Sequence, residues 1–167
     1  MIGKNQDTDP VIHSFPPISN ELSHTLILGT MPSVKSREAG FYYSHPRNRF
    51  WLVIAECLGL QVPKSIEDKK KLLLGIGIAI WDVLAECEIV GSDDSTIRKP
   101  VYNDIATLIV DKPITKILCN GKKAYSLCKN LDLPVTVCYV PSTSPANAAW
   151  SLERLVEAWR VELSLKS

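Results

Sequence analysis

Thr25-Leu26-Ile27-Leu28-Gly29-Thr30-Met31-Pro32-Ser33 is the stretch that decides the fold. It begins with a short apolar run, and a glycine and small polar residues follow at once. A run of this length that ends in glycine is typical of a buried strand in a parallel sheet. The loops at the carboxyl ends of such strands form the ligand crevice of open α/β sheets. We therefore expect a strand over residues 25–30 and a functional loop directly after it.

The rest of the chain alternates between strand and helix patterns. We expect further strands over residues 76–83, 116–120 and 135–140, and helices over residues 47–58, 65–74, 121–131 and 146–163. Ser65 precedes Asp68 by three residues, which resembles a helix capping box. Alternating strands and helices pack as a parallel sheet between helical layers. The predicted fold is α/β, a three-layer α/β/α sandwich with a central four-stranded parallel sheet.

Length and composition set the domain organisation. The chain has 167 residues, 46% hydrophobic and 22% charged, which fits one globular domain with a sizeable core. Residues 1–24 contain three prolines among polar residues and are predicted to be an irregular lead-in whose few apolar residues pack on the body. Residues 25–167 are predicted to form a single domain.

Charge and cysteine content exclude several classes of protein. A net charge of +1 argues against a strongly basic nucleic-acid-coating protein but is compatible with a local basic patch. The five cysteines are odd in number and widely spaced and the three histidines are scattered, so we expect reduced thiols, a cytoplasmic location and no metal site. No apolar stretch approaches the ~20 residues that a membrane span requires. We therefore expect no membrane association.

Nucleotide-binding motifs are missing at the predicted sheet edge. No G-x-G-x-x-G follows the first strand, and Gly121-Lys122-Lys123 lacks the glycine-rich turn and Ser/Thr of a phosphate-binding loop. We therefore expect no cofactor. Four polar segments should still converge at this edge, namely the loop after residue 30, Trp81-Asp82, Asn120-Gly121 and the loop that starts at Pro141.

Three blocks of sequence resemble the uracil-DNA glycosylase superfamily, and within it the hypoxanthine-DNA glycosylase (family 6) branch and the mismatch-specific thymine/uracil-DNA glycosylases. The first block joins residues 29–33 to Gly40-Phe41-Tyr42-Tyr43-Ser44-His45-Pro46-Arg47-Asn48-Arg49-Phe50-Trp51. The second covers residues 74–80, and the third joins Pro141-Ser142 and Ser144 to residues 152–158. The resemblance implies an enzyme that flips a damaged base out of DNA and hydrolyses its N-glycosidic bond. Because no lysine has a local setting that suggests a Schiff-base nucleophile, we expect a monofunctional enzyme that does not cleave the strand.

The resemblance also implies which residues carry the catalysis. Met31 stands where many relatives have an acid or amide that places the hydrolytic water, and a thioether cannot do this. The hypoxanthine branch suggests Asn48 instead, with a cap on the helix that begins near Arg47 as the alternative. Asn120 is the second predicted catalytic residue, at the base edge or leaving group, with backbone hydrogen bonding at its turn as the alternative.

The base pocket is expected to use the same segments. Tyr43 matches the aromatic residue that stacks on the flipped base. Thr30, Met31, Trp81 and Asp82 are the other predicted base-binding residues. The Asp82 carboxylate could accept a hydrogen bond from a purine N–H, or it could serve in a cap or ion pair.

DNA contacts are expected from two loops. His45 and Arg47 come from the first. Pro141, Ser142, Thr143 and Ser144 come from the second, through hydroxyls and the amino end of the final helix. Alternatively, Ser144 or Pro145 simply starts that helix. Val140 replaces the His or Asn that relatives often have before Pro-Ser.

The expected activity is removal of deaminated bases from DNA, hypoxanthine first and uracil second, by a monomer whose partner is DNA that contains such bases. Three alternatives stay open. One is a mismatch-specific uracil/thymine-DNA glycosylase, another is a catalytically weak damaged-DNA-binding protein, and the third is a small-molecule site on the same fold.

Overall fold

A four-stranded, all-parallel sheet forms the centre of the protein. The computed structural model describes residues 10–13 and 15–163 of the chain. The strand order is β3-β2-β6-β7, formed by β2 (Thr25–Gly29), β3 (Ile78–Asp82), β6 (Lys116–Asn120) and β7 (Thr136–Val140). All four predicted strands are confirmed, and β6 has the predicted bounds.

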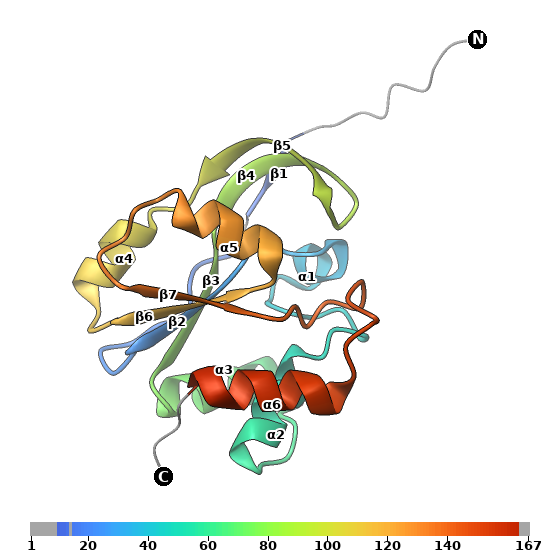
Figure 1. Ribbon diagram of the computed structural model, residues 1–167, viewed down its shortest axis with the longest axis vertical. Helices are drawn as coiled ribbons and strands as arrows, with labels where there is room; N and C mark the ends of the chain where they lie inside the picture. Colours follow the sequence, from blue (N-terminus) through green and yellow to red (C-terminus); the bar gives the residue numbers. More distant parts are fainter. Residues whose placement is uncertain (1–9, 14, 164–167) are drawn as a thin grey trace.

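Helices cover both faces of this sheet (Figure 1). One face carries α2 (Phe50–Leu58), α3 (Ile66–Gly75) and α6 (Leu152–Leu163), and the other carries α4 (Ile105–Asp111) and α5 (Lys122–Lys129). Side chains of β2 alternate between the two layers, because Ile27 packs in the core under α2 and α6, whereas Leu26 and Leu28 pack under α4 and α5. The predicted three-layer α/β/α fold is confirmed.

Helix ends follow from local sequence, with one correction. Ser65 caps α3 as predicted, since its hydroxyl accepts the backbone N–H of Asp68 at 3.0 Å. The last helix, however, begins at Leu152 and not at residue 146. The Arg49 guanidinium holds residues 141–151 as a loop, because it donates to the backbone carbonyls of Asn147 and Trp150 at 3.1 and 2.5 Å. The expectation that Ser144 or Pro145 starts this helix is wrong.

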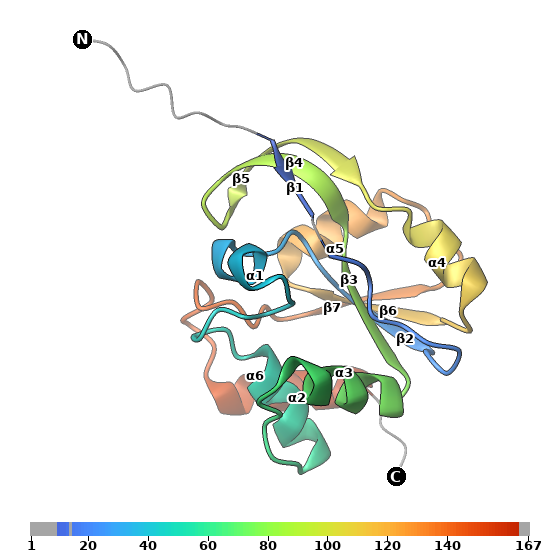
Figure 2. The same cartoon turned by 180° about the vertical axis from the view of Figure 1, so that it is seen from behind.

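A second sheet lies outside the sandwich and was not predicted. It is antiparallel, in the order β1-β4-β5, and consists of β1 (Val11–Ile12), β4 (Leu84–Val90) and β5 (Asp93–Tyr102). Figure 2 shows that β4 continues from β3 and that the hairpin of β4 and β5 arches away from the parallel sheet. Register shifts in the β4–β5 pair interrupt the period-two alternation that would have revealed it. Residues 11–12 thus form a strand within the expected irregular lead-in.

The loop predicted after β2 also contains structure. Ser33 caps a short helix, α1 (Val34–Ala39), by accepting the backbone N–H of Ser36 at 3.1 Å. The helix ends at Gly40 in the left-handed conformation. This turn of helix returns the chain to the sheet edge, so that the aromatic residues after Gly40 reach the carboxyl end of β2.

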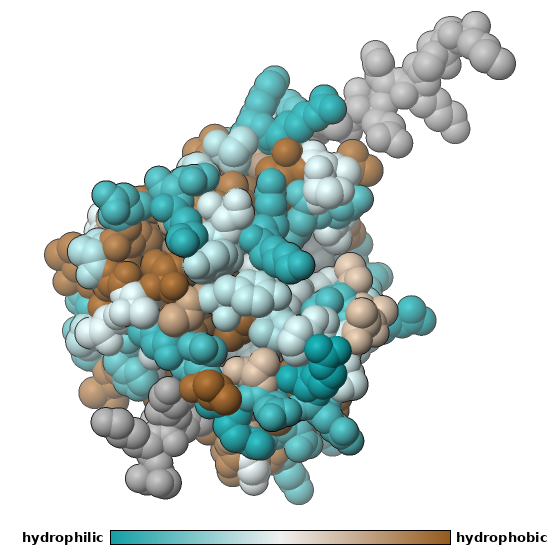
Figure 3. Space-filling model, in the orientation of Figure 1, coloured by the Kyte–Doolittle hydropathy of each residue, from teal (hydrophilic) through white to brown (hydrophobic). Residues whose placement is uncertain are grey.

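The surface is mostly a mixture of polar and apolar side chains (Figure 3). Hydrophobic side chains gather at the left of this view over α4, where Val110 is 82% exposed. Within the part of the chain that the structure describes, no helix is long and apolar enough to cross a membrane.

Replacement of Trp159 by Phe should destabilise the fold. Trp159 is fully buried, and its indole N–H donates to the backbone carbonyl of Pro141 at 2.9 Å. Phe leaves this carbonyl without its partner and opens a small cavity, so we expect a loss of about 1–3 kcal/mol in the free energy of unfolding by urea. Trp150→Phe is the matched control, because Trp150 is only half-buried, and it should change stability less. Equal effects of the two substitutions would contradict the role of this hydrogen bond.

Candidate functional site

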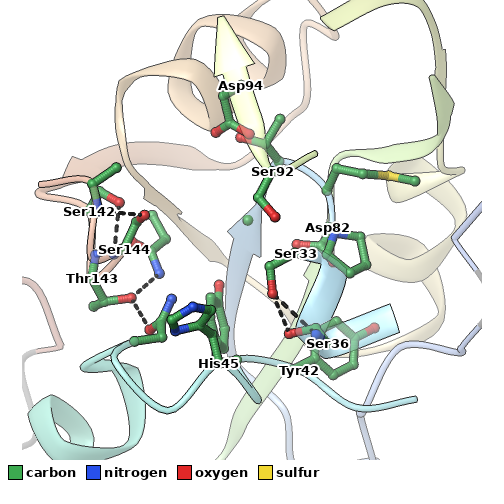
Figure 4. A pocket seen from close by; sticks show the side chains of 18 of the residues that line it. Ser33, Ser36, Tyr42, His45, Asp82, Ser92, Asp94, Ser142, Thr143 and Ser144 are labelled. Carbon is green, nitrogen blue, oxygen red and sulfur yellow. Dashed lines mark hydrogen bonds between the residues drawn. The ribbon is translucent and has the colours of Figure 1, made fainter. Parts of the chain in front are cut away.

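A cavity of about 250 Å³ opens at the carboxyl ends of β2, β3 and β6 (Figure 4). The chain goes outward from β2 to β3 and later crosses back past β2 to β6, so the strand order reverses between β2 and β6. The cavity lies at this switch point, where ligands of open α/β folds bind. Met31 and several polar and aromatic residues line it, among them Thr30, Tyr42, Tyr43, His45, Asn48, Asp82, Ser92, Asp94, Asn120, Ser142, Thr143 and Ser144.

The floor of the cavity is a buried carboxylate above a glycine. Asp82 is 3% exposed, and its register partner on β2 is Gly29. A Cβ at Gly29 would collide with Asp82 Oδ1, so only glycine lets the carboxylate lie there. The other oxygen, Oδ2, is 2.8 Å from Nε2 of the buried His13 side chain. Asp82 therefore has a buried side-chain partner, and His13 was missed because it lies 69 residues away in the sequence.

A hydrogen-bonded relay joins the two predicted catalytic amides. Asn120 Nδ2 donates to Thr143 Oγ1 at 3.0 Å, and this hydroxyl donates to Asn48 Oδ1 at 2.9 Å. Asn120 Oδ1 in turn accepts the Thr143 backbone N–H at 3.0 Å. Gly121 allows this close approach, because it has φ +100° and a Cβ there would press on Ser142 at 3.2 Å. The relay fixes both amides at the wall of the cavity.

Asn48 also bonds to the start of α2, from the position directly before its N-cap residue Arg49. Its Oδ1 accepts the backbone N–H of Phe50, the first residue of α2, at 2.9 Å, in addition to the Thr143 hydroxyl. Both interpretations of Asn48 from sequence are therefore compatible with the geometry. Both lone pairs of Oδ1 are occupied, whereas Nδ2 donates to no residue in the described part of the chain.

Thr143 is the shared partner of the two amides. It was expected to contact DNA. Its side chain is fully buried, its hydroxyl donates to Asn48, and its backbone N–H donates to Asn120. Ser142 and Ser144 remain at the cavity wall, away from any helix start. Their hydroxyl oxygens accept the backbone N–H groups of Ser144 and Ala146 at 3.1 and 3.2 Å, which leaves the hydroxyl hydrogens free to donate.

Tyr43 lies in the cavity wall with a strained backbone. Its φ of +53° is uncommon for a residue other than glycine, and its ring stacks on Phe50 at a centroid distance of 4.0 Å. Burial, and then the Asp82 charge, raise the pKa of the Tyr43 hydroxyl, so this group stays protonated. Burial and Asp82 likewise raise the pKa of Tyr42, which donates to the carbonyl of Pro16.

Other predicted site residues lie outside the cavity or at its margin. Trp81 packs against both hydrophobic cores, Arg47 is exposed, and Pro141 is buried beside Trp159; the cavity lining includes none of the three. Met31 lines the cavity but is 9% exposed and packs in the core on the side of α4 and α5. In residues 10–13 and 15–163, no group of three or more His, Cys, Asp or Glu side chains could hold a metal ion.

Asp94 is a site residue that the sequence analysis missed. It comes from β5 and lines the cavity from the hairpin side, across from His45 and Thr143 in Figure 4. Burial raises the pKa of its carboxyl to about 6, helped by the nearby Asp82 and Asp93 charges and opposed by the Thr30 hydroxyl and Lys123. The signal that could have found it is the Gly91-Ser92 pair between two strand-like runs, which is typical of a tight hairpin.

The chain is similar to known proteins along most of its length. The model of the uracil DNA glycosylase superfamily matches residues 16–162. A hypoxanthine DNA glycosylase of Methanosarcina acetivorans is 33% identical over 145 residues, which cover 84% of this chain and 90% of that protein. One from Methanosarcina barkeri is 31% identical over 112 residues, which cover 66% of this chain and 71% of that protein.

A solved structure has the same fold. It is the solution NMR structure of a Methanosarcina acetivorans protein assigned as a uracil DNA glycosylase, with a TM-score of 0.77 and 32% sequence identity. The match covers 89% of this chain and 94% of that one.

The raised pKa of Asp94 predicts that its charge destabilises the fold. The pKa of the Asp94 carboxyl is about 6 in the folded protein and 3.8 in the unfolded chain. Between pH 3.8 and about 6, the folded protein therefore keeps a proton that the unfolded chain has lost. The free energy of unfolding therefore falls as the pH rises through this window. Asp94→Asn removes the charge, and urea denaturation should show a gain of about 1–3 kcal/mol at pH 8 that shrinks towards pH 4.

Asp93→Asn is the matched control for this measurement. Asp93 is exposed and accepts hydrogen bonds from Ser95, which lower the pKa of its carboxyl. It should give no gain at pH 8. A gain from Asp94→Asn of the same size at pH 4 and pH 8 would show that the effect does not come from the buried charge.

Proposed function

The chain belongs to the uracil DNA glycosylase superfamily, and we propose that this DNA glycosylase excises deaminated bases from DNA in base-excision repair, with hypoxanthine as the preferred base and uracil second. The observation that carries the proposal is the convergence of the Asn48 and Asn120 amides on one cavity beside Tyr43. The names of both curated relatives support hypoxanthine as the substrate. These names give less support to the alternative of a mismatch-specific uracil/thymine-DNA glycosylase.

The Asp82 carboxylate is suited to recognising deamination itself. Deamination of adenine to hypoxanthine, or of cytosine to uracil, converts a ring nitrogen from a hydrogen-bond acceptor into an N–H donor. His13 binds Oδ2 of Asp82, which leaves Oδ1 above Gly29 as an acceptor at the cavity floor. A base with a ring N–H pairs with this oxygen, whereas the parent base would leave a buried carboxylate facing another acceptor.

Tyr43 is the proposed stacking platform. Phe50 covers one face of the Tyr43 ring, and Tyr43 itself lines the cavity. Stacking on an aromatic ring returns part of the few kcal/mol that base flipping costs. The stack on Phe50 holds the Tyr43 ring in place before the base arrives.

Hydrolysis needs a positioned water and stabilisation of the leaving base. Asn48 Nδ2 is free to donate to the water, and the relay through Thr143 fixes the direction in which it points. Asn120 Nδ2 carries a second N–H besides the one that it gives to Thr143, and this group can reach the leaving base. No lysine lines the cavity in the described chain, so we propose hydrolysis without a Schiff base or strand cleavage.

The DNA strand is proposed to lie across the mouth of the cavity. His45, Ser142 and Ser144 line this region, and Arg47 is exposed on the neighbouring loop. The serine hydroxyls can donate to phosphate oxygens. We also propose that the protein works as a monomer on DNA and in the cytoplasm, where its free cysteines stay reduced.

Base release from end-labelled duplexes tests the proposed function. The duplexes carry one hypoxanthine, uracil, xanthine or T·G mismatch, and alkali cleaves the abasic product. We expect hypoxanthine release to be fastest, with no strand cleavage before alkali. Asn48→Ala should lower the single-turnover rate about 100-fold or more, because the donor to the water is lost.

Duplex binding by the same variant separates the alternatives. Affinity close to that of the parent chain would place the loss in the chemical step. Binding without release from any duplex would instead identify a damaged-DNA-binding protein, and fastest release from the T·G mismatch would identify a mismatch-specific enzyme.

Thr143→Val tests the relay. Valine keeps the shape of the side chain but removes the hydroxyl, so Asn48 and Asn120 lose their common partner. We expect a loss of about 1–3 kcal/mol in the free energy of unfolding and an excision rate lower by about 10- to 100-fold because Asn48 is displaced. Thr143→Ser keeps the hydroxyl and should stay close to the parent rate. A Val variant as active as the Ser variant would exclude a role for the relay in catalysis.

A further inference from the structure

The geometry of Asn48 leaves the proposed reaction without a residue that accepts the proton of the hydrolytic water. Its amide oxygen already accepts two hydrogen bonds, from the Phe50 backbone N–H and the Thr143 hydroxyl. Its amide nitrogen can only donate. Asn48 can therefore hold a water molecule but cannot accept a proton from it.

The other titratable groups of the cavity wall are poorly suited to accept this proton. Asp82 lies at the buried floor with one oxygen bound to His13 and the other above Gly29, where we place the base edge. His45 Nδ1 accepts the backbone N–H of Arg47 at 3.0 Å, so its Nε2 carries the proton when the ring is neutral. Tyr42 and Tyr43 stay protonated.

Asp94 is different in position and surroundings. It lines the cavity from the β4–β5 hairpin, on the opposite side from the His45 loop and the Thr143 loop (Figure 4). Its carboxylate faces the Thr30 hydroxyl, directly before Met31, the position at which the sequence lacks an acid or amide. Asp94 has no basic side chain bound to it in the described chain.

We propose that Asp94 is the general base of the reaction and supplies from the hairpin the carboxylate that the first motif lacks at Met31. This inference rests on the proposed glycosylase function. It assigns the proton transfer to a residue outside the three sequence blocks that define the resemblance.

The water oxygen forms a bond to C1′ of the deoxyribose while the bond from C1′ to N9 of hypoxanthine breaks and its electron pair leaves with the base. Asp94 takes one proton from the water, and the sugar keeps the hydroxyl group. The proton then passes from Asp94 to the departing base, so the carboxylate is restored and a neutral base is released.

Burial and the charges around Asp94 give its carboxylate a pKa at which it can act as a base near neutral pH. The titratable and charged groups that face it are Asp82 on β3, Lys123 on α5, Asp93 on β5, Tyr43, and Cys87 with its neighbour Arg37. Burial and the two carboxylates raise the pKa of Asp94 to about 6. Because a base works only when ionised, the excision rate should rise with pH through about 6 and level off above it.

The test measures single-turnover release of hypoxanthine from a duplex between pH 5 and pH 8. We expect Asp94→Asn to lower the rate about 100-fold or more above pH 7 and to remove the rise through pH 6. Asp94→Glu keeps the carboxylate and should restore part of the rate and the pH dependence. Asp93→Asn is the matched control and should keep the rate at high pH and a rise with pH, shifted to slightly lower pH because one charge that raises the pKa of Asp94 is removed. Duplex affinity and the urea midpoint of each variant show that binding and folding are intact.

Each other outcome overturns the proposal. If Asp94→Asn stays within about 3-fold of the parent rate, or if the rise through pH 6 persists in it, the base is another group. A parent rate that falls as the pH rises would make Asp94 an acid rather than a base. These results leave the proposed function standing, whereas a parent chain that releases no base from any duplex removes both proposals.

Discussion

The Thr143 hydroxyl is the one interaction on which the arrangement of the site depends. It joins Asn120 at the end of β6 to Asn48 at the start of α2, through a loop that follows β7. Three segments far apart in the sequence therefore hold one another at the sheet edge. Because the hydroxyl accepts from one amide and donates to the other, the two hydrogen bonds polarise each other in the same direction. The relay also consumes the acceptor of Asn48, which limits the chemistry that this amide can perform.

Polar groups are buried next to the relay, and contacts with neighbouring residues offset the free-energy cost of this burial. Asp82 is stabilised by His13, and the 141–151 loop is held by Arg49, whose backbone N–H also donates to the carbonyl of Thr143 at 3.0 Å. Tyr43 keeps a strained backbone because its ring is stacked on Phe50. Strain and buried charge of this kind collect at functional sites, where the surrounding structure fixes them in place.

The β4–β5 hairpin gives the sandwich an additional wall. In the parallel sheet, side chains reach the cavity only from the carboxyl ends of strands and the loops behind them. The hairpin instead approaches from the side, since β4 leaves β3 directly (Figure 2) and residues at its turn line the cavity. It brings Ser92 and Asp94 to the cavity. A carboxylate from this direction supplies a charge that the motif residues after β2 lack.

The sequence by itself determined the parallel sheet, the capped helix at Ser65 and the segments that meet at the sheet edge, because apolar runs and caps are local signals. The family resemblance placed Tyr43, Asn48 and Asn120 at one site, and the structure brings them to one cavity. Only the tertiary structure decided the partners. Thr143 links the amides, His13 binds Asp82, and Asp94 enters from a hairpin whose bulges hide its alternation. Hydrogen bonds between segments tens of residues apart leave no local pattern in a sequence, so these contacts appear only once the chain has folded.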